Sequence, residues 1–258
     1  MTPGAALVTG AARRIGRAIA GALAADGWRV VLHYNRSRDE VETLCDEITA
    51  AGGRAVALRA DLADADAYAD LVQESADSLD GPLTLLVNNA SIFQYDKPQT
   101  VTAESFNTHM ATNALAPLLL SQAFAARLPD GEKGLIVNML DNKVFNLNPD
   151  FFSYTVSKVA LHGITEMLTL ALAPQIRVAG IAPGVTLISG RQTPESFEKS
   201  HRYNLLRRGG TVPEIVSALR FIIASPSLTG QTLVLDGGQS KVRQERDVAF
   251  LTGTEEES

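Results

Sequence analysis

The sequence predicts one α/β domain, a doubly wound parallel sheet of about seven strands with helices on both faces. Strand-like and helix-like segments alternate along the chain, which is the pattern of such a sheet. The strand-like segments are continuous apolar runs, as expected for strands buried on both faces. The alternation contains no linker, internal repeat or low-complexity stretch. We therefore expect a single domain over residues 1–240, followed by a charged tail over 241–258.

Each element has its own signal in the chain. The first helix carries Ile15, Ile19 and Leu23 on one stripe at helical spacing. The strands are short and apolar, and they are expected at Ala5–Thr9, Trp28–Tyr34, Ala55–Leu58, Leu83–Val87, Leu135–Met139, Ile176–Ile181 and Thr232–Leu235. The helices between them are amphipathic or apolar, and they are expected at Arg14–Asp26, Asp39–Ala50, Asp64–Leu79, Ala103–Leu128 (with a break near its middle) and Phe152–Ala173, which Pro174 stops.

Two segments fall outside the alternation. Residues 184–210 form a long excursion before the last helix, and loops of this length often act as lids. Residues 241–258 end in Glu-Glu-Glu-Ser, and a charged terminus of this kind is expected to be mobile at its tip.

Composition excludes several classes of protein. The formal net charge of −6 disfavours a broad nucleic-acid footprint, which needs clustered Lys and Arg. Cys45 is the only cysteine, so no intrachain disulfide forms and no oxidising compartment is implied. Cys45 also lacks the companions of a zinc site, and no metal is predicted. The chain begins without a basic, apolar leader, and its longest apolar run, 114–128, is too interrupted to span a bilayer. We expect a cytoplasmic protein with no membrane or nucleic-acid partner.

A glycine-containing turn joins the first strand to the first helix. It reads Thr9-Gly10-Ala-Ala-Arg13-Arg14-Ile15-Gly16. Glycines there allow close approach of a pyrophosphate, and a helix N-terminus offers N–H donors and a favourable dipole. The alternative is a plain strand-to-helix turn.

The end of the second strand favours NADPH over NADH. An NAD site usually has a carboxylate at this position, whereas the chain reads His33-Tyr34-Asn35-Arg36-Ser37. Arg36 and Ser37 can form charge-assisted hydrogen bonds with a 2′-phosphate. The alternative is a solvated basic turn.

Tyr154 and Lys158 lie one helical turn apart on one face. An ammonium beside a phenol favours the phenolate, so Lys158 is expected to lower the pKa of Tyr154 from about 10. Such a tyrosine serves as a general acid or base. The alternative is a solvated helix face.

These motifs together resemble the short-chain dehydrogenase/reductase family, whose fold is Rossmann-type. The family loop is Thr-Gly-x-x-x-Gly-x-Gly. Arg14 replaces its middle glycine, which resembles the loop of the pteridine reductases. The resemblance implies that Asp61 contacts adenine, that Asn113 supports a proton-relay water, and that Lys158 also binds the nicotinamide ribose. The expected cofactor set is Gly10, Arg13, Arg14, Ile15, Gly16, His33, Tyr34, Asn35, Arg36, Ser37, Asp61, Leu62, Asn88, Ala90, Ser91, Met139, Tyr154, Lys158, Pro183, Gly184, Val185 and Thr186.

Asp141 stands where most family members carry a serine, 13 residues before the tyrosine. The pteridine reductase and bacterial dihydromonapterin reductase branch has this aspartate, and a carboxyl group suits a reaction that protonates nitrogen. The alternative is that Asp141 only caps the following loop and catalysis is weakened. The branch also implies that Phe93 stacks on a bound pterin, although Phe93 alone could be a core residue. The expected substrate set is Arg14, Ser91, Phe93, Asp141, Tyr154 and Gly184.

The resulting hypothesis is a reductase that transfers hydride from NADPH to a dihydropterin or dihydrofolate, with Asp141, Tyr154, Lys158 and Asn113 as the catalytic set. A carbonyl reductase of a 3-oxoacyl thioester or small ketone is the nearest alternative. A catalytically silent NADPH-binding regulator is an alternative of another class. The resemblance also implies a homo-oligomer, a dimer or tetramer, that packs through helices 103–128 and 152–173.

Overall fold

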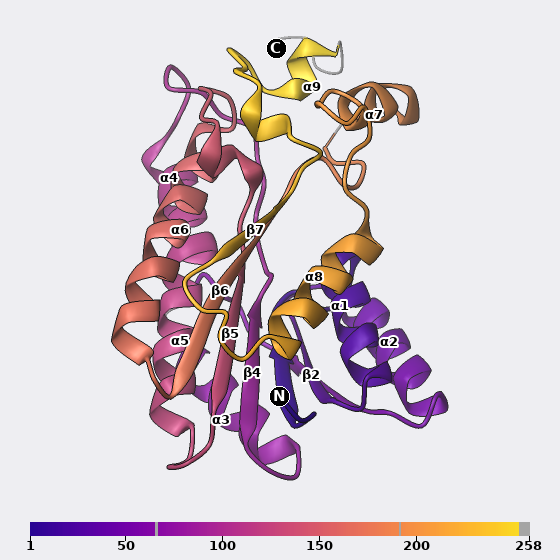
Figure 1. The fold of residues 1–258 in the computed structure, drawn as a ribbon, viewed down its shortest axis with the longest axis vertical. Helices are drawn as coiled ribbons and strands as arrows, with labels where there is room; N and C mark the ends of the chain where they lie inside the picture. Colours follow the sequence, from indigo (N-terminus) through magenta and orange to yellow (C-terminus); the bar gives the residue numbers. More distant parts are fainter. Residues whose placement is uncertain (65–66, 191, 253–258) are drawn as a thin grey trace.

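Seven parallel strands form one sheet in the order β3-β2-β1-β4-β5-β6-β7 (Figure 1). The computed structural model describes residues 1–64, 67–190 and 192–252. The strand order reverses between β1 and β4, and ligands of such sheets bind at the carboxyl ends of the strands beside this point. The strands are β1 Ala5–Val8, β2 Arg29–Tyr34, β3 Arg54–Arg59, β4 Leu83–Asn88, β5 Gly134–Met139, β6 Ile176–Pro183 and β7 Thr232–Leu235.

Helices cover both faces of the sheet (Figure 1), which confirms the predicted doubly wound fold. One face carries α1 Arg14–Ala25, α2 Arg38–Ala50 and α8 Val212–Ala224. The other carries α3 Ala67–Ser78, α4 Ala103–Met110, α5 Ala116–Arg127 and α6 Phe152–Leu172. The expected helix over 64–79 includes residues 65 and 66, which lie outside the described residues.

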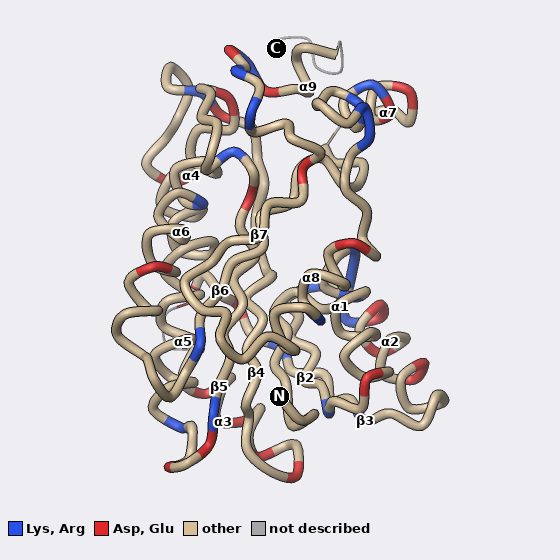
Figure 2. The backbone as a smooth tube through the Cα atoms, in the orientation of Figure 1, with Lys and Arg blue, Asp and Glu red and all other residues tan. Residues whose placement is uncertain are grey.

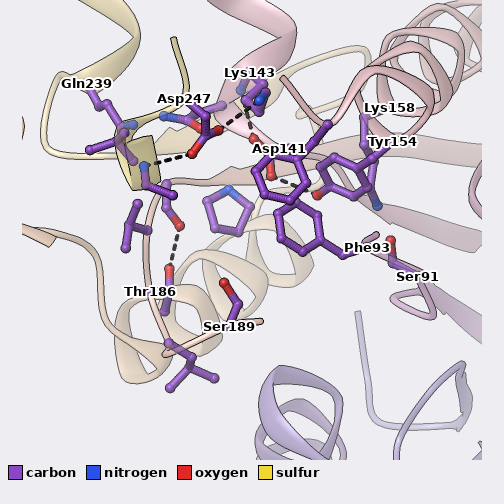
Figure 3. A pocket seen from close by; sticks show the side chains of 18 of the residues that line it. Ser91, Phe93, Asp141, Lys143, Tyr154, Lys158, Thr186, Ser189, Gln239 and Asp247 are labelled. Atoms are coloured by element: carbon purple, nitrogen blue, oxygen red, sulfur yellow. Dashed lines mark hydrogen bonds and ion pairs between the residues drawn. The ribbon is translucent and has the colours of Figure 1, made fainter. Parts of the chain in front are cut away.

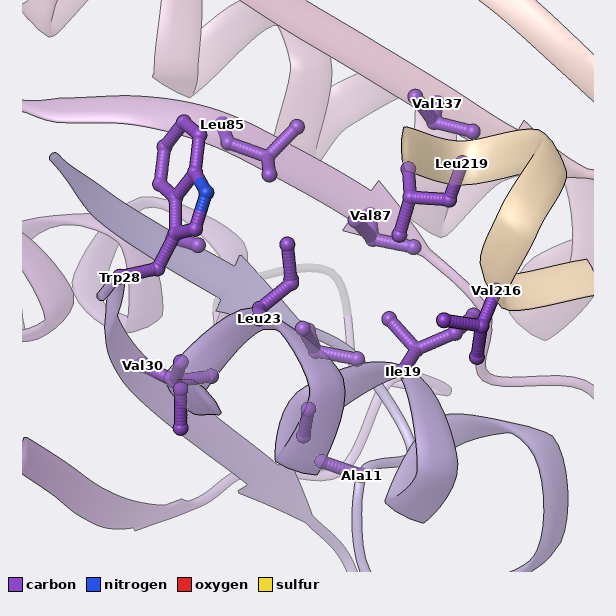
Figure 4. Close-up of a cluster of buried hydrophobic side chains, with 14 of the residues drawn as sticks. Ala11, Ile19, Leu23, Trp28, Val30, Leu85, Val87, Val137, Val216 and Leu219 are labelled. Atoms are coloured by element: carbon purple, nitrogen blue, oxygen red, sulfur yellow. The ribbon is translucent and has the colours of Figure 1, made fainter. Parts of the chain in front are cut away.

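Apolar packing fixes α1 against the sheet. Ile19 and Leu23 of α1 contact a cluster that includes Val30 of β2, Val87 of β4 and Leu219 of α8, all at most 1% exposed (Figure 4). Burial of each such side chain stabilises the fold by about 1.5–3 kcal/mol. The start of α1, where the glycine turn lies, is therefore held on a rigid base.

The helices on the face that carries α1 are also joined by surface ion pairs. Arg17 on α1 pairs with Glu47 on α2 at 2.6 Å, and Arg220 on α8 pairs with Asp26 at 2.7 Å. Figure 2 shows basic residues interspersed with acidic ones over this part of the chain. Because these pairs are exposed, each contributes at most about 1 kcal/mol.

The predicted break in helix 103–128 is a π-helical turn, η1 Ala111–Leu115, between α4 and α5. Such turns often occur at functional sites because they place a side chain out of the regular helical register. Here the turn carries Asn113, which is fully buried.

The two segments outside the alternation have structure of their own. Residues 184–210 contain α7 Pro194–His201, and residues 239–252 contain the short helices η3 Gln239–Lys241 and α9 Val248–Leu251. Ser200 of α7 bonds to Thr252 at 2.7 Å between their hydroxyl oxygens. The segment 242–252 therefore packs on the domain. The acidic tip expected to be mobile, at 255–258, lies outside the described residues, as does residue 191.

Within the described ranges, no helix is both long and apolar enough to cross a bilayer. The same part of the chain contains no group of three His, Cys, Asp or Glu side chains arranged to hold a metal ion.

Candidate active site

A large pocket opens at the carboxyl ends of β5 and β6 (Figure 3). Its volume of about 1080 Å³ is at the upper end of small-molecule sites, so it has room for two ring systems. The glycine turn, the segment after β4, the start of α6, the residues after β6 and the C-terminal segment all contribute walls.

The glycine turn is closely packed. Gly10 has φ of 63°, a left-handed conformation that favours glycine. A Cβ on Gly16 would lie 2.2 Å from the Gly10 carbonyl oxygen. The Gly10 N–H donates to His33 Nδ1 at 3.1 Å, so β2 supports the turn directly.

Arg14 has φ of 54° at the start of α1, a conformation that is rare for residues other than glycine and costly to maintain. Its guanidinium donates to the Ile188 carbonyl at 2.7 Å, which ties the turn to the 184–210 segment. The N-cap residue Arg13 makes no side-chain cap bond, and the first turn of α1 has no acidic residue. The N-terminal N–H groups of α1 thus suit an anion.

The residues predicted to bind a 2′-phosphate lie at the surface, directly after β2. Arg36 is exposed, and Ser37 stands at the N-cap of α2 without a side-chain cap bond. Arg13, also predicted to bind the cofactor, pairs instead with Glu40 of α2. Asp61 accepts a hydrogen bond from the Ala63 N–H at 3.0 Å, so its carboxylate shapes the turn after β3.

Asn88 and Asn89 point in different directions. The Asn88 side chain is buried and donates to Asn138 Oδ1 at 2.8 Å, which leaves only its backbone for a cofactor role. Asn89 lines the pocket and donates to the Thr9 and Gly10 carbonyls at 2.9 and 3.2 Å. No role was predicted for the Asn89 side chain.

Asp141 and Tyr154 meet in the pocket. Tyr154 Oη donates to Asp141 Oδ2 at 2.7 Å, while Asp141 Oδ1 accepts from the Lys143 N–H at 2.9 Å (Figure 3). Asp141 therefore caps the following 3-10 turn, η2 Asn142–Phe145, and also contacts the tyrosine. Lys158 Nζ donates to the Met139 carbonyl at 2.8 Å and lies 5.7 Å from the centre of the Tyr154 ring.

The expected pKa change of Tyr154 has the wrong sign. Burial, and then the negative charge of Asp141, raise the pKa of Tyr154 well above its usual value. Burial lowers the pKa of Lys158 to about 8 and raises the pKa of Asp141, against the opposing hydrogen bonds from Lys143 and Tyr154. Burial penalises every charged form here, and the tyrosine keeps its proton at neutral pH.

Asn113 is buried and bonds to segments that form the pocket. Its Oδ1 accepts from the Ile92 N–H at 2.9 Å and from Ser91 Oγ at 3.2 Å, and its Nδ2 donates to Ser157 Oγ at 3.0 Å. The amide thus joins the π-helical turn to the 91–92 segment and to α6.

Aromatic side chains from three separate segments form one wall. Phe93 stacks on Phe151 with ring centres 4.3 Å apart and meets the Tyr154 ring edge-on at 4.7 Å. Tyr95 contacts Phe250 of the C-terminal segment at 5.2 Å. Phe93 is 40% exposed, so it is a pocket residue and not a core residue.

Several pocket residues were not predicted from the sequence. They come from η2, from the residue before α6, from η3 and from the C-terminal segment, and they include Lys143, Phe151, Gln239, Gln244, Asp247 and Phe250. A helix-capping pattern could have indicated one of them, since Asp247 precedes the apolar run 248–251 and accepts from the Ala249 N–H at 3.0 Å. The others depend on long-range folding.

Most of the predicted substrate and catalytic residues lie together. The pocket is lined by Arg14, Ile15, Ser91, Phe93, Met139, Asp141, Tyr154, Lys158, Pro183, Gly184, Val185 and Thr186. The remaining predicted cofactor residues lie along the strand ends of β1 to β4 outside this pocket, where the adenosine half of a dinucleotide is expected.

Comparisons with known proteins agree with this geometry. A sequence profile described as short chain dehydrogenase matches residues 4–198. The structure is similar to the crystal structure of FolM alternative dihydrofolate reductase 1 from Brucella canis complexed with NADP, with a TM-score of 0.90, 43% identity, and coverage of 96% of this chain and 98% of that one. Pteridine reductase 1 from Leishmania tarentolae is 32% identical over 92% of this chain and 96% of its own length. A 3-oxoacyl-[acyl-carrier-protein] reductase from Synechocystis sp. is 31% identical, with 92% and 97% covered.

Proposed function

Because the chain belongs to the short chain dehydrogenase family, we propose that it is an NADPH-dependent reductase of a pterin, either a dihydropterin or a dihydrofolate. The hydrogen bond between Tyr154 and Asp141, 2.7 Å long, is the observation that carries the proposal. A generic carbonyl reductase of the family has a serine in place of this carboxyl group. The similarity to a dihydrofolate reductase and to a pteridine reductase supports the same branch.

The residues present fit NADPH. The uncapped N-terminus of α1 and the close Gly10–Gly16 contact suit a pyrophosphate. Arg36 and the hydroxyl of Ser37, which makes no cap bond to α2, suit a 2′-phosphate. When bound, the nicotinamide supplies the hydride. Lys158 and the 183–186 segment would hold its ribose and carboxamide, as the family resemblance implies.

The chain's own residues manage the proton. Reduction of a ring C=N bond adds one hydride to carbon and one proton to nitrogen. Tyr154 keeps its proton because burial raises its pKa, and burial raises the pKa of Asp141 as well, which favours its protonated form. The Asp141 carboxyl group can deliver a proton to nitrogen. The carboxylate that remains accepts the hydrogen bond from Tyr154 Oη and takes up its next proton from water.

The aromatic wall suits a flat ring system. Phe93 presents an exposed aromatic surface beside Tyr154, and offset stacking on such a surface stabilises a bound ring. Arg14 is anchored at the same pocket and would contact a ring oxygen.

The homo-oligomer that the family resemblance implies would pack through α4, α5 and α6. Met167 and Leu170 on α6 are 71% and 84% exposed, and Val159 is 40% exposed. Exposed apolar side chains gathered on one helix support a contact between subunits at that helix.

The test is NADPH oxidation with a matched panel: dihydropterins, dihydrofolate, a 3-oxoacyl thioester and a small ketone. We expect turnover of at least one dihydropterin or dihydrofolate above turnover of any ketone. The similarity to a 3-oxoacyl reductase makes that thioester the main competitor. Reduction of the thioester or the ketone alone would replace the pterin assignment, and NADPH binding without any turnover would favour the regulatory alternative.

A further inference from the structure

The C-terminal segment 242–252 is held over the substrate end of the pocket by two ion pairs. Arg246 Nε lies 3.0 and 2.8 Å from the two carboxylate oxygens of Asp150. Lys143 Nζ donates to Asp247 Oδ2 at 2.8 Å. Asp150 and Lys143 are only 1% and 7% exposed. Removal of one member of a buried pair leaves the other charge uncompensated, which is strongly unfavourable.

Lys143 contacts the catalytic residue and the C-terminal segment at the same time. Its backbone N–H donates to Asp141, and its ammonium donates to Asp247, to Asn148 Oδ1 at 3.0 Å and to the Asp150 carbonyl at 2.9 Å. Figure 3 shows Lys143 next to both aspartates. The 3-10 turn after β5 thus links the proton-bearing group to the segment that closes the pocket.

Charges from three elements act on this site. The ammonium groups of Lys143, on η2, and Lys158, on α6, both favour the ionised form of Asp141. Asp247, before α9, acts in the opposite sense on Tyr154. The carboxylate of Asp236, after β7, accepts hydrogen bonds from the Gly238 and Ser240 N–H groups at 2.8 and 2.7 Å.

We propose that Asp247 is a positioning residue that seats the segment 242–252 on Lys143 and neutralises the lysine charge beside Asp141. Closure of the substrate pocket and retention of the catalytic proton then occur together. If the segment leaves, the Lys143 ammonium acts on Asp141 without the opposing charge of Asp247, and the proton is lost more readily. The link to catalysis rests on the proposed function; the seating of the segment does not.

The first experiment is the pH profile of kcat/KM for four proteins: the parent, Asp247→Asn, Asp247→Glu and the double variant Lys143→Met/Asp247→Asn. Activity should fall at alkaline pH as the proton-bearing form is lost. In Asp247→Asn this fall should move to lower pH by about half a unit or more, because one nearby charge shifts a pKa by this order. Glu keeps the charge and should restore the parental profile, and loss of the lysine should cancel the effect of Asp247→Asn.

The second experiment does not depend on the substrate. Hydrogen exchange of the amides at 247–252 should speed up at least tenfold in Asp247→Asn and return towards the parental rate in Asp247→Glu. NADPH affinity should stay unchanged. The control is Glu42→Gln, which removes an exposed ion pair with Arg38 on α2 and should alter neither measurement.

The outcomes separate the two proposals. Faster exchange with an unshifted pH profile would overturn the coupling, and unchanged exchange would overturn the seating. If the parent reduces a ketone but no pterin, the proposed function fails, and the profiles are then measured with that ketone. A shift there still supports the coupling, because Asp247 also acts on Tyr154, and an unshifted profile overturns it.

Discussion

The proposed cofactor end and the proposed substrate end of the site are built in different ways. At the cofactor end, the Gly10 and Gly16 turn, the uncapped α1 N-terminus and the bond from Gly10 to His33 arise where strands end and a helix begins. At the substrate end, side chains from 143–151 meet side chains from 242–252, about a hundred residues later. Short motifs therefore predict a cofactor site, whereas substrate choice at the proposed site would depend on contacts between distant segments.

The largest expected effect falls where the two ends meet, at Asp141. Asp141→Asn keeps the shape of the side chain and an acceptor for the Lys143 N–H, but it cannot deliver or accept a carboxyl proton. Turnover of a dihydropterin should fall by about 10²–10⁴-fold, the usual range for general acid–base catalysis. Steady-state kinetics should show kcat and kcat/KM falling together, the mark of an interaction made in the transition state.

NADPH affinity is the control measurement for Asp141→Asn, and it should be the same in the variant and the parent. Asp141→Ser should instead recreate the serine of the carbonyl reductases and raise ketone reduction. Full pterin turnover by Asp141→Asn would show that the carboxyl proton is not used.

This contrast also explains how much the sequence could predict. The seven strands, the helices on both faces and the interrupted helix at 103–128 follow from apolar runs and helical periodicity. The predicted shift in the pKa of Tyr154 had the wrong sign because the sequence shows only the spacing of Tyr154 and Lys158. Burial and the approach of Asp141, which raise this pKa, arise from the tertiary structure. Gln244 and Phe250 were missed because their place depends on Arg246 reaching Asp150, which no local pattern contains.

The next effect concerns the support of the glycine turn. His33 accepts from the Gly10 N–H, and its Nε2 lies 3.2 Å from the Ala60 carbonyl. Burial lowers the pKa of His33 from 6.5 to about 4, so the folded protein holds the neutral ring while the unfolded chain takes up a proton below pH 6.5. The stabilisation is complete above pH 6.5 and is lost as the pH falls towards 4.

Chemical denaturation between pH 7 and pH 5 measures this loss. The parent should lose about 2 kcal/mol of unfolding free energy more than His33→Asn over that interval, because only the parent has an imidazole to protonate. Asn keeps an acceptor for the Gly10 N–H. Both proteins share every other titrating group, so equal losses would mean that His33 does not set this pH dependence.

The smallest expected effect tests whether the cofactor end acts through local residues alone. Arg36 is exposed beside the N-cap of α2, and removal of a single charge there should leave the pocket unchanged. Arg36→Ala should therefore weaken NADPH about tenfold, which is about 1.4 kcal/mol, and leave NADH nearly unaffected. Fluorescence titration of both nucleotides measures the two affinities. Arg38→Ala is the matched control, since Arg38 is an equally basic neighbour that pairs with Glu42 at 2.9 Å. Equal loss in the two variants would indicate general electrostatic attraction, whereas loss confined to Arg36→Ala and to NADPH would indicate a specific contact with the 2′-phosphate.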